Sequence, residues 1–395
     1  MAHPQRHPFT KRLLLAAALG FAFAALMAAI TPSQGARAAS GDRSYVFATV
    51  DFPKAGNTYV MANNASGDIV GYYTDANKVY HGFLLHGGAL TTLDYPGSDV
   101  AWTQVEAIND AGDVAGIYSL KSPAPAGNVH GFLRTAAGDW SNVDYPEGTH
   151  IMAGGAYGIL ADGTVVGCYH DGTASAVTAM FGYAKGPKGA TSFNYPPGAP
   201  WAMHYSATPD GKTLVGGYLA GANQPDNWHG YALDGGRVIS FDVPGKLSTL
   251  ALGVGPSPEM PIVGTYKVPV DKAWNQHGFV AETRGGLNPA TWKFTMVDVP
   301  DATQTIVRGI NAGGDLVGSY VDASGVTHGF LAKAAAPSGA GTPVSPAPLP
   351  PNTGNGLGQP APDAPIDPVA FAGAGVLALA VATLGLRLCR KAPRN

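Results

Sequence analysis

The phrase His-Gly-Phe-Leu, or a close variant of it, recurs along this chain at nearly constant spacing. Its first positions are His81, His130, His229, His277 and His328, with Phe181 in the place of one missing histidine. Successive positions lie 49, 51, 48, 48 and 51 residues apart. A period near 50 residues indicates one supersecondary unit repeated about six times along the chain.

Two further landmarks accompany each phrase. The first closes a short β-prone run: Asp51-Phe52-Pro53, Asp94-Tyr95-Pro96, Asp144-Tyr145-Pro146, Asn194-Tyr195-Pro196, Asp242-Val243-Pro244 and Asp298-Val299-Pro300. Proline lacks the N–H that a sheet ladder needs, so it ends each strand at the same place. The second is a Gly/Asp turn that leads into a β-branched strand, as in Gly67-Asp68-Ile69-Val70-Gly71 and Gly314-Asp315-Leu316-Val317-Gly318. Each unit therefore reads as four short strands.

Four-stranded units of this length predict an all-β fold, a six-bladed β-propeller over residues 45–336. The ends of the array are offset, because residues 45–50 form a fourth-strand pattern while the last unit stops after His328-Gly329-Phe330-Leu331. We expect the N-terminal strand to complete the last blade, since this closure removes two exposed sheet edges. An open β-solenoid is the alternative.

The His-Gly-Phe phrases, the Asp-Tyr-Pro strand ends and the Gly-Asp-Ile-Val-Gly strands together resemble the HAF family of bacterial extracellular repeat proteins. That family is named for a His-Ala-Phe triplet, whose middle position is Gly here. The resemblance covers nearly all of residues 45–336. It implies an exported repeat protein and brings no catalytic residues with it.

The N-terminus has the composition of a secretory signal peptide over residues 1–38. Arg6, Lys11 and Arg12 precede eighteen uncharged, mostly apolar residues, and small residues follow at Ala36, Ala38 and Ala39. This order predicts cleavage after Ala38 or Ala39. The alternative is an uncleaved anchor, because eighteen residues are just enough to span a bilayer.

The C-terminus predicts a stalk and an anchor. Residues 337–368 contain ten of the 32 prolines, which favours an extended, unfolded linker. Residues 369–386 are apolar and long enough for a transmembrane helix, and residues 387–395 form a basic tail that we expect on the cytoplasmic side. The repeat domain would then lie outside the cell, on the bacterial envelope.

Before the apolar span stands a candidate sorting motif, Leu349, Pro350, Pro351, Asn352, Thr353 and Gly354. With the span and the basic tail, it resembles a Leu-Pro-x-Thr-Gly cell-wall sorting signal, which implies sortase as a partner and cleavage between Thr353 and Gly354. The motif has one residue too many. The alternative is therefore a proline-rich stalk that leads to a permanent membrane anchor.

Charge and cysteine content exclude two classes of interaction. Without residues 1–38 and 387–395, 16 basic residues face 27 acidic ones. A net negative ectodomain repels phosphate backbones, so we expect no nucleic-acid partner and no binding to anionic lipid. Cys168 lies in the repeat domain and Cys389 beyond the apolar span, so we expect no disulfide.

The five repeat histidines are expected to be structural. Equivalent positions in different blades are spread around a ring, whereas metal ligands must converge on one point. We expect each imidazole to hydrogen-bond backbone or the recurrent Asp, and we expect no metal and no cofactor. The aspartates of the Gly/Asp turns should cap their own backbone, although Asp75, Asp171 and Asp322 are candidate Ca²⁺ ligands in loops.

Known catalytic motifs are missing from the sequence. We therefore expect a non-catalytic, surface-displayed module that binds carbohydrate or protein. The aromatic residues expected to be exposed for this binding are Trp102, Trp201, Trp228 and Trp274. The alternative is an extracellular glycan-active hydrolase or lyase, with its site among the non-repeating residues His150, His170, His204, Trp201 and Tyr205.

Overall fold

The structure is a computed structural model of the whole chain. It describes residues 30–32, 44–121, 129–145, 152–173, 176–193, 199, 201–219, 227–270 and 273–335. Apart from one short 3-10 helix, η1 (Pro289–Thr291), the regular structure in these ranges consists of strands. The prediction of an all-β fold is confirmed.

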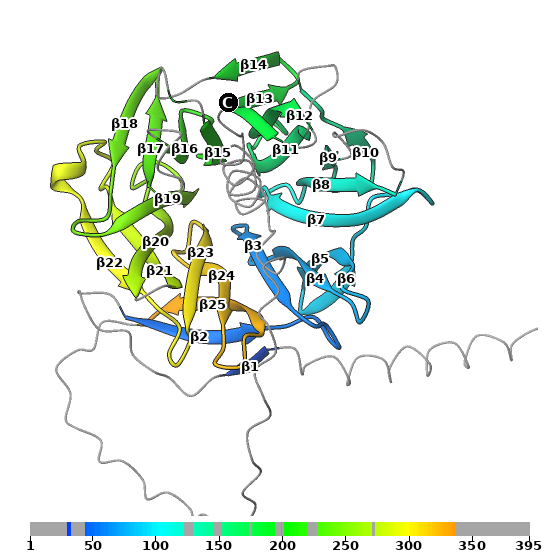
Figure 1. The fold of residues 1–395 in the computed structure, drawn as a ribbon, viewed down its shortest axis with the longest axis horizontal. Helices are drawn as coiled ribbons and strands as arrows, with labels where there is room; N and C mark the ends of the chain where they lie inside the picture. Colours follow the sequence, from blue (N-terminus) through cyan, green and yellow to red (C-terminus); the bar gives the residue numbers. More distant parts are fainter. Residues whose placement is uncertain are drawn as a thin grey trace, which may run out of the picture.

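The strands lie in antiparallel groups around a central axis, in a β-propeller arrangement (Figure 1). The first two groups are β3 (Thr58–Asn63), β4 (Ile69–Thr74), β5 (Tyr80–His86) and β6 (Ala89–Thr92), then β7 (Val100–Ile108), β8 (Val114–Leu120), β9 (Val129–Arg134) and β10 (Trp140–Asn142). The next two are β11 (Met152–Ile159), β12 (Val165–Thr173), β13 (Ala176–Gly186) and β14 (Gly189–Phe193), then β15 (Trp201–Ala207), β16 (Thr213–Leu219), β17 (Trp228–Asp234) and β18 (Arg237–Phe241). The last are β19 (Leu247–Val254), β20 (Ile262–Val270), β21 (Ala273–Glu282) and β22 (Lys293–Val297), then β23 (Gln304–Ile310), β24 (Leu316–Val321) and β25 (Thr327–Ala334), which β2 (Tyr45–Val50) and β1 (Ile30–Pro32) extend.

Hydrogen bonding divides these strands into four sheets, where the sequence predicted six separate blades. Two sheets have four strands, one has five, and one has twelve. The physical reason is a pair of parallel contacts, Met152 with Val129 and Met180 with Trp201, which join three neighbouring antiparallel groups into the twelve-stranded sheet. Six separate blades require that each strand forms hydrogen bonds only with strands of its own group.

The predicted ring closure is confirmed. β2 pairs antiparallel with β25, from Tyr45 opposite Ala334 to Val50 opposite Gly329. Tyr45, Phe47 and Val50 are buried, so the closing strand contributes apolar side chains to the core as well as backbone hydrogen bonds. β1 then pairs with β2, although Ile30–Pro32 falls within the segment expected to be a signal peptide.

The repeat phrase has a packing reason at two of its positions. The aromatic residue after each Gly is completely buried: Phe83, Phe132, Tyr183, Tyr231, Phe279 and Phe330. The Gly itself lets neighbouring groups approach closely. A Cβ on Gly82 would lie 2.4 Å from the Leu93 carbonyl oxygen and 2.6 Å from a methyl group of Val105, on the first strand of the next group. The Gly and the aromatic residue of the phrase are therefore required by contacts between neighbouring groups as well as by packing within each group.

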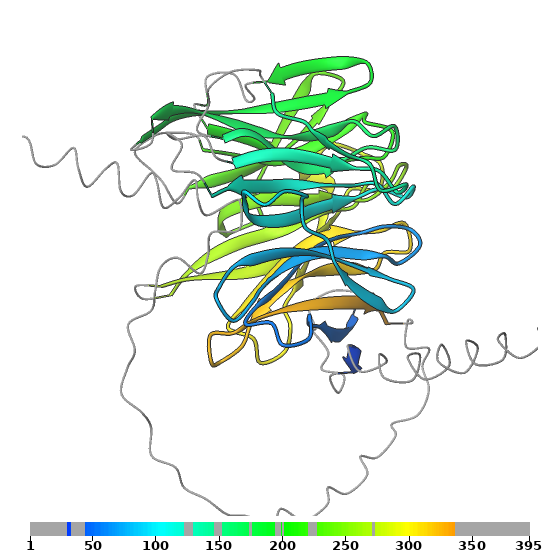
Figure 2. The ribbon, with the colours of Figure 1, turned by 90° about the vertical axis from the view of Figure 1, so that its right-hand side faces the viewer.

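The strands cross the molecule from one face of the ring to the other (Figure 2). The first strand of each group starts at one face, which we call the loop face. There lie the connections from fourth to first strands and from second to third strands. The opposite face, which we call the turn face, carries the turns from first to second and from third to fourth strands, such as residues 64–68 and 87–88.

The terminal predictions fall outside the described residues. Ala36, Ala38 and Ala39 of the signal cleavage site belong to this part, as does the motif from Leu349 to Gly354. The expected stalk and span at residues 337–386 lie there too. Within the described residues, no helix combines the length and apolar character needed to cross a bilayer.

Candidate functional site in the central channel

Every first strand carries a β-bulge at the same position. The register with the second strand skips one residue each time: Met61, Glu106, Tyr157, Tyr205, Leu252 and Arg308. A bulge leaves its extra residue out of the ladder and redirects its side chain. All six residues line the same cavity on the axis, so we call them the bulge ring.

The last Gly of the Gly-Asp-Ile-Val-Gly landmark makes this bulge possible. A Cβ at that position would lie 1.6–2.1 Å from a first-strand carbonyl oxygen in all six groups, at Gly71, Gly116, Gly167, Gly216, Gly264 and Gly318. No side chain fits at such a distance, and the obstacle is backbone that does not move aside. The repeated glycine is therefore coupled to the side chains that face the channel.

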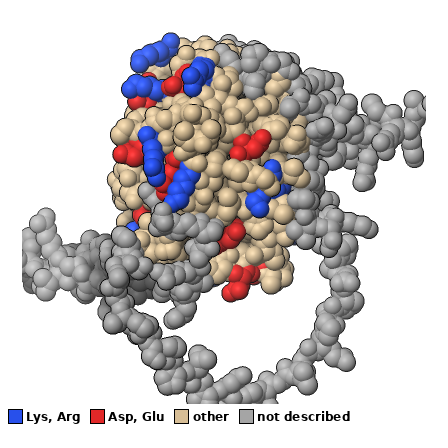
Figure 3. All heavy atoms as spheres, turned by 90° about the vertical axis from the view of Figure 1, so that its left-hand side faces the viewer, with Lys and Arg blue, Asp and Glu red and all other residues tan. Residues whose placement is uncertain are grey.

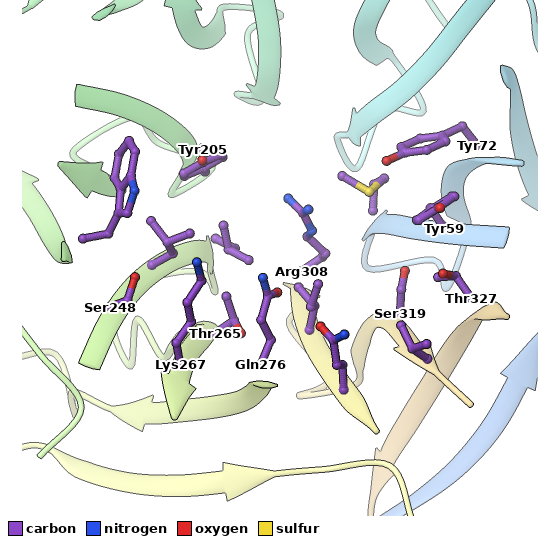
Figure 4. Close-up of a pocket in the computed structure, with 17 residues that line it drawn as sticks. Tyr59, Tyr72, Tyr205, Ser248, Thr265, Lys267, Gln276, Arg308, Ser319 and Thr327 are labelled. Carbon is purple, nitrogen blue, oxygen red and sulfur yellow. The ribbon is translucent and has the colours of Figure 1, made fainter. Parts of the chain in front are cut away.

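Two hollows meet at the bulge ring. The first, the axial cavity, has a volume of about 320 Å³ and extends from the ring toward the turn face, where Asn109 and Asn311 border it. The second, the loop-face pocket, has about 80 Å³ and opens on the other side of the ring (Figure 4). Arg308 lines both of them.

Aromatic rings and polar side chains from several strands line the loop-face pocket. Tyr59, Tyr72 and Tyr205 lie at its upper side in Figure 4, and Lys267 and Gln276 extend toward it from below. Burial raises the pKa of Tyr59 to about 12, and it raises the pKa of Tyr72 and Tyr205 above the ordinary range. These phenols are therefore neutral hydrogen-bonding groups at physiological pH.

Two polar groups of this pocket lack partners within the described part of the chain. Trp228 is 4% exposed and Ser248 is 3% exposed, and neither the indole Nε1 of the first nor the Oγ of the second has a hydrogen-bond partner. Buried polar groups nearly always have partners, because an unsatisfied one costs about 1–3 kcal/mol. Both residues line the loop-face pocket, so a bound ligand is a natural partner for them.

The bulge ring carries one acid and one base. Glu106 is 4% exposed, its Oε1 has no partner among the described residues, and burial raises the pKa of its carboxyl to about 7 despite the opposing field of Arg308. No ion pair of 4.0 Å or less joins Glu106 to Arg308. The two charges therefore face one cavity without neutralising each other directly.

The repeat histidines lie away from this channel. In all five, Nδ1 lies 2.7–3.0 Å from a carboxylate oxygen of the recurrent aspartate: His81 with Asp94, His130 with Asp144, His229 with Asp242, His277 with Asp298 and His328 with Asp51. The expected hydrogen bond to the recurrent Asp is therefore present in every copy. Within the described ranges, no cluster of three or more His, Cys, Asp or Glu is arranged to hold a metal ion.

Each of these histidines also lies against a second-strand tyrosine, with ring centroids 5.1–5.4 Å apart: Tyr73, Tyr118, Tyr218, Tyr266 and Tyr320. In the unit without histidine, Phe181 stacks on Tyr169 at 5.1 Å. The same unit has Asn194 in place of the aspartate. The stack is thus kept where the charged partner is absent.

The candidate catalytic residues do not form one site. His170 and His204 are both buried, which lowers the pKa of each to about 4. His170 Nε2 lies 3.2 Å from the Sγ of Cys168, whereas His204 Nδ1 contacts the hydroxyl of Tyr231. Tyr205 belongs to the bulge ring, and His150 lies outside the described residues.

Two of the turn aspartates, Asp68 and Asp113, have partners other than those expected, whereas Asp162 Oδ1 accepts from the Thr164 N–H at 2.9 Å within its own turn, as expected. Asp68 Oδ1 accepts from His86 at 2.7 Å, and Asp113 Oδ1 accepts from the Ala136 N–H at 2.8 Å, so these turn aspartates bind the neighbouring turn rather than their own backbone. The reason is that an asparagine caps the turn instead: Asn109 Oδ1 accepts from the Asp113 N–H.

The candidate Ca²⁺ ligands that are described, Asp75 and Asp322, are engaged within their own loops. Asp75 Oδ1 accepts from the N–H groups of Asn77 and Val79, both at 2.8 Å. Asp322 Oδ1 accepts in the same way from Ser324 and Val326, at 2.8 and 2.9 Å. The side chain of Asp171 is outside the described part.

The prediction of exposed tryptophans is wrong for two of them. Trp201 and Trp228 are buried strand residues, because both pack in one apolar cluster with Tyr205 and Leu219. Trp102 is partly buried on β7, and the side chain of Trp274 is not described.

On the molecular face that carries β18 and β22, charged residues of both signs are sparse and intermingled (Figure 3).

Comparison with known proteins adds little beyond the fold. No protein-family model matches the chain, and no curated protein matches it significantly, so the HAF resemblance stays an expectation. Among solved structures, it is similar to an AofleA triple mutant from Arthrobotrys oligospora (12% identity, 74% of this chain and 83% of that chain, TM-score 0.43). It is also similar to an Aleuria aurantia lectin mutant with α-methyl-L-fucoside (11%, 75% and 98%, TM-score 0.40), and to the β-propeller domain of a Pyrococcus furiosus protease (11%, 71% and 94%, TM-score 0.36).

Proposed function

We propose that this chain is a non-catalytic carbohydrate-binding protein, and that it takes a sugar in the loop-face pocket. The observation that carries the proposal is the pair of unpartnered polar groups there, Trp228 Nε1 and Ser248 Oγ. An indole N–H only donates, whereas a hydroxyl both donates and accepts. A sugar hydroxyl does both, so one sugar edge satisfies the two groups together.

The rest of the pocket fits the same ligand class. Sugar rings have apolar C–H faces, which pack on aromatic side chains, and the pocket offers Tyr59, Tyr72 and Tyr205. Gln276 and Lys267 add hydrogen-bond donors at the rim. Whole small-molecule sites have about 300–1,000 Å³, so a hollow of about 80 Å³ admits one edge of a terminal sugar rather than a whole chain segment.

The scaffold we propose has six blades, with the twelve-stranded sheet counted as three of them. Its bulge ring supplies one residue from each group. We also propose HAF-type membership, export by the N-terminal leader and display on the cell envelope through the stalk and the span at residues 369–386. The sequence patterns of both termini support this display, and the mass of the mature protein from cells tests it.

Binding without catalysis is supported by the placement of acids along the channel. The carboxylates that line the axial cavity are Glu106 and Asp110. Glu106 lies within β7, whereas Asp110 lies in the turn that follows this strand. Asp110 is also exposed, and it accepts a hydrogen bond from the Ala65 N–H at 2.8 Å. A buried acid and an exposed acid that is already engaged by backbone do not form the close pair of carboxyl groups that cleaves glycosidic bonds.

The test is a glycan array with the full-length protein in detergent, followed by calorimetric titration of the best sugar. Trp228→Phe and Ser248→Ala should each weaken binding by about tenfold, because each removes one hydrogen bond. Trp292→Phe is the matched control, because Trp292 is equally buried but donates to the Gly286 carbonyl oxygen, outside the pocket. Equal losses in Trp228→Phe and Trp292→Phe would refute a site in this pocket.

A further inference from the structure

The axial cavity presents a separated pair of opposite charges. Glu106 on β7 and Arg308 on β23 both line it, at equivalent bulge positions two groups apart around the ring. Within the described residues, no hydrogen bond or ion pair engages the Arg308 guanidinium, and Glu106 Oε1 has no partner. Both groups therefore have unused hydrogen-bonding capacity directed to one cavity.

Without a ligand, this arrangement lowers the stability of the folded chain. The buried Glu106 carboxylate is costly without a partner, and a neighbouring base normally forms a salt bridge with such an acid, yet the partly buried Arg308 does not. Here the bulges fix both side chains on separate first strands, and the glycines opposite the bulges, Gly116 and Gly318, leave no room for a different register. The separation is thus built into the backbone.

We propose that the axial cavity is a binding site for a small zwitterion of the α-amino-acid class. Its ammonium group pairs with the Glu106 carboxylate, and its carboxylate pairs with the Arg308 guanidinium. A guanidinium binds a carboxylate through two parallel N–H···O bonds, which also orients the ligand. A single molecule with both charges satisfies both groups, whereas an ion of either sign leaves one of them unpaired.

The remaining walls agree with a ligand of this size and polarity. The volume of about 320 Å³ is within the range of small-molecule sites. Met61 and Leu252 of the bulge ring offer an apolar surface to a ligand side chain. Tyr157 and Tyr205 are neutral, because burial raises the pKa of both phenols, and Asp110 is exposed at the turn-face rim.

This site is distinct from the proposed sugar site. Trp228, Ser248 and Lys267 line the loop-face pocket and not the axial cavity, whereas Glu106 lines the axial cavity and not the loop-face pocket. Sugar binding and zwitterion binding can therefore fail independently. Among the described residues, four members of the bulge ring border both hollows: Arg308 and the uncharged Met61, Tyr205 and Leu252.

The test titrates the full-length protein calorimetrically with glycine, L-leucine and L-phenylalanine at millimolar concentration. Two matched probes lack one charge each: 3-phenylpropanoate has no ammonium, and 2-phenylethylamine has no carboxylate. We expect binding of at least one amino acid, and binding of each single-charge probe about 10- to 100-fold weaker than that of L-phenylalanine.

Charge-neutralising variants then assign the two ends. Glu106→Gln should weaken amino-acid binding about 10- to 100-fold and leave the affinity for 3-phenylpropanoate unchanged. Arg308→Met should also weaken amino-acid binding about 10- to 100-fold, and it should leave the affinity for 2-phenylethylamine unchanged. Glu259→Gln, at an exposed turn, is the control for Glu106. Absence of binding for all three amino acids, or equal affinity of L-phenylalanine for wild type and Glu106→Gln, would overturn the proposal. Each variant should still unfold cooperatively on heating, which shows that a loss of binding does not come from a loss of the fold.

Discussion

His328 Nδ1 lies 2.8 Å from an oxygen of Asp51, a residue 277 positions earlier in the chain. The same contact joins residues only 13 to 21 positions apart in the other groups with a histidine, as in His81 with Asp94 and His277 with Asp298. The closing strand therefore reproduces a contact of the repeat between the two ends of the array. Closure of the ring is as specific as the packing of any internal group.

We predict that loss of the closing strand destabilises the whole fold. Deletion of residues 44–50 removes β2 and the burial of Tyr45, Phe47 and Val50, which should lower the free energy of unfolding by about 5 kcal/mol or more. Denaturant unfolding measures this loss. Deletion of residues 337–348, outside the described domain, is the control, and similar unfolding midpoints for the two deletions would contradict closure.

We predict that the His–Asp pair contributes modestly to stability. His130→Ala should lower the free energy of unfolding by about 1–2 kcal/mol, because it leaves Asp144 with one partner fewer and removes the stack on Tyr118. Both side chains are about one-fifth exposed, which keeps the value small. His86→Ala is the control, since its side chain is 74% exposed although it also binds an aspartate at 2.7 Å.

A double-mutant cycle refines this prediction. The unit with Phe181 and Asn194 lacks both charged partners, so His130→Phe should be tolerated better together with Asp144→Asn than alone. We expect a coupling energy of about 1 kcal/mol from unfolding measurements on the four proteins. Strict additivity would show that histidine and aspartate act independently.

We predict that the glycine opposite a bulge is indispensable. Gly116→Ala places a Cβ 2.1 Å from the Gln104 carbonyl oxygen, beside the bulge at Glu106, so it should destabilise the fold by about 3 kcal/mol or more. Gly286→Ala is the control, because its added Cβ comes no closer than 3.6 Å to any atom. Thermal unfolding of both variants decides the point, and equal stability would mean that the first strand adapts without its bulge.

Stability should fall with rising pH through the titration of Glu106. Burial raises the pKa of this carboxyl from 4.5 to about 7, so the folded protein binds more protons than the unfolded chain between these values. The free energy of unfolding therefore decreases as pH rises through this window, by up to about 3 kcal/mol from this group. Arg308 is the charged group that acts on this carboxyl, and the nearby phenols of Tyr72, Tyr157 and Tyr205 stay neutral over this range.

Glu106→Gln tests that dependence. The variant should gain stability over wild type at pH 8 and differ little from it at pH 4.5, as denaturant unfolding at the two values measures. Glu259→Gln, at an exposed position, should keep the wild-type dependence. If the stability difference between wild type and Glu106→Gln is the same at both pH values, the carboxyl does not titrate in the buried state proposed for it.

The sequence predicts the strands and the closure well, because its landmarks mark strand ends and close approaches. Pro53 ends a strand, Gly82 admits the next group, and the offset at residues 45–50 indicates the closing strand. It predicts the sheets less well, since single parallel contacts such as Met180 with Trp201 depend on how far neighbouring groups splay.

The channel residues were missed for a different reason. Glu106 and Arg308 occupy equivalent places, three residues before Asn109 and Asn311, but a bulge reverses the facing of the residue it adds. The regular alternation of side chains between the two faces of a strand therefore places Glu106 and Arg308 on the wrong face. Alignment of the three units that carry this asparagine would have shown one variable position, Met61, Glu106 or Arg308, flanked by small or apolar residues.

In the proposed function, the unpartnered groups of the loop-face pocket bind sugar. A crystal structure of the full-length protein with the sugar selected on the array tests it most directly. We expect density in the pocket, with sugar hydroxyls at hydrogen-bonding distance from Trp228 Nε1 and Ser248 Oγ. Density for the sugar only on the outer surface of the ring, with both groups still unpartnered, would contradict it.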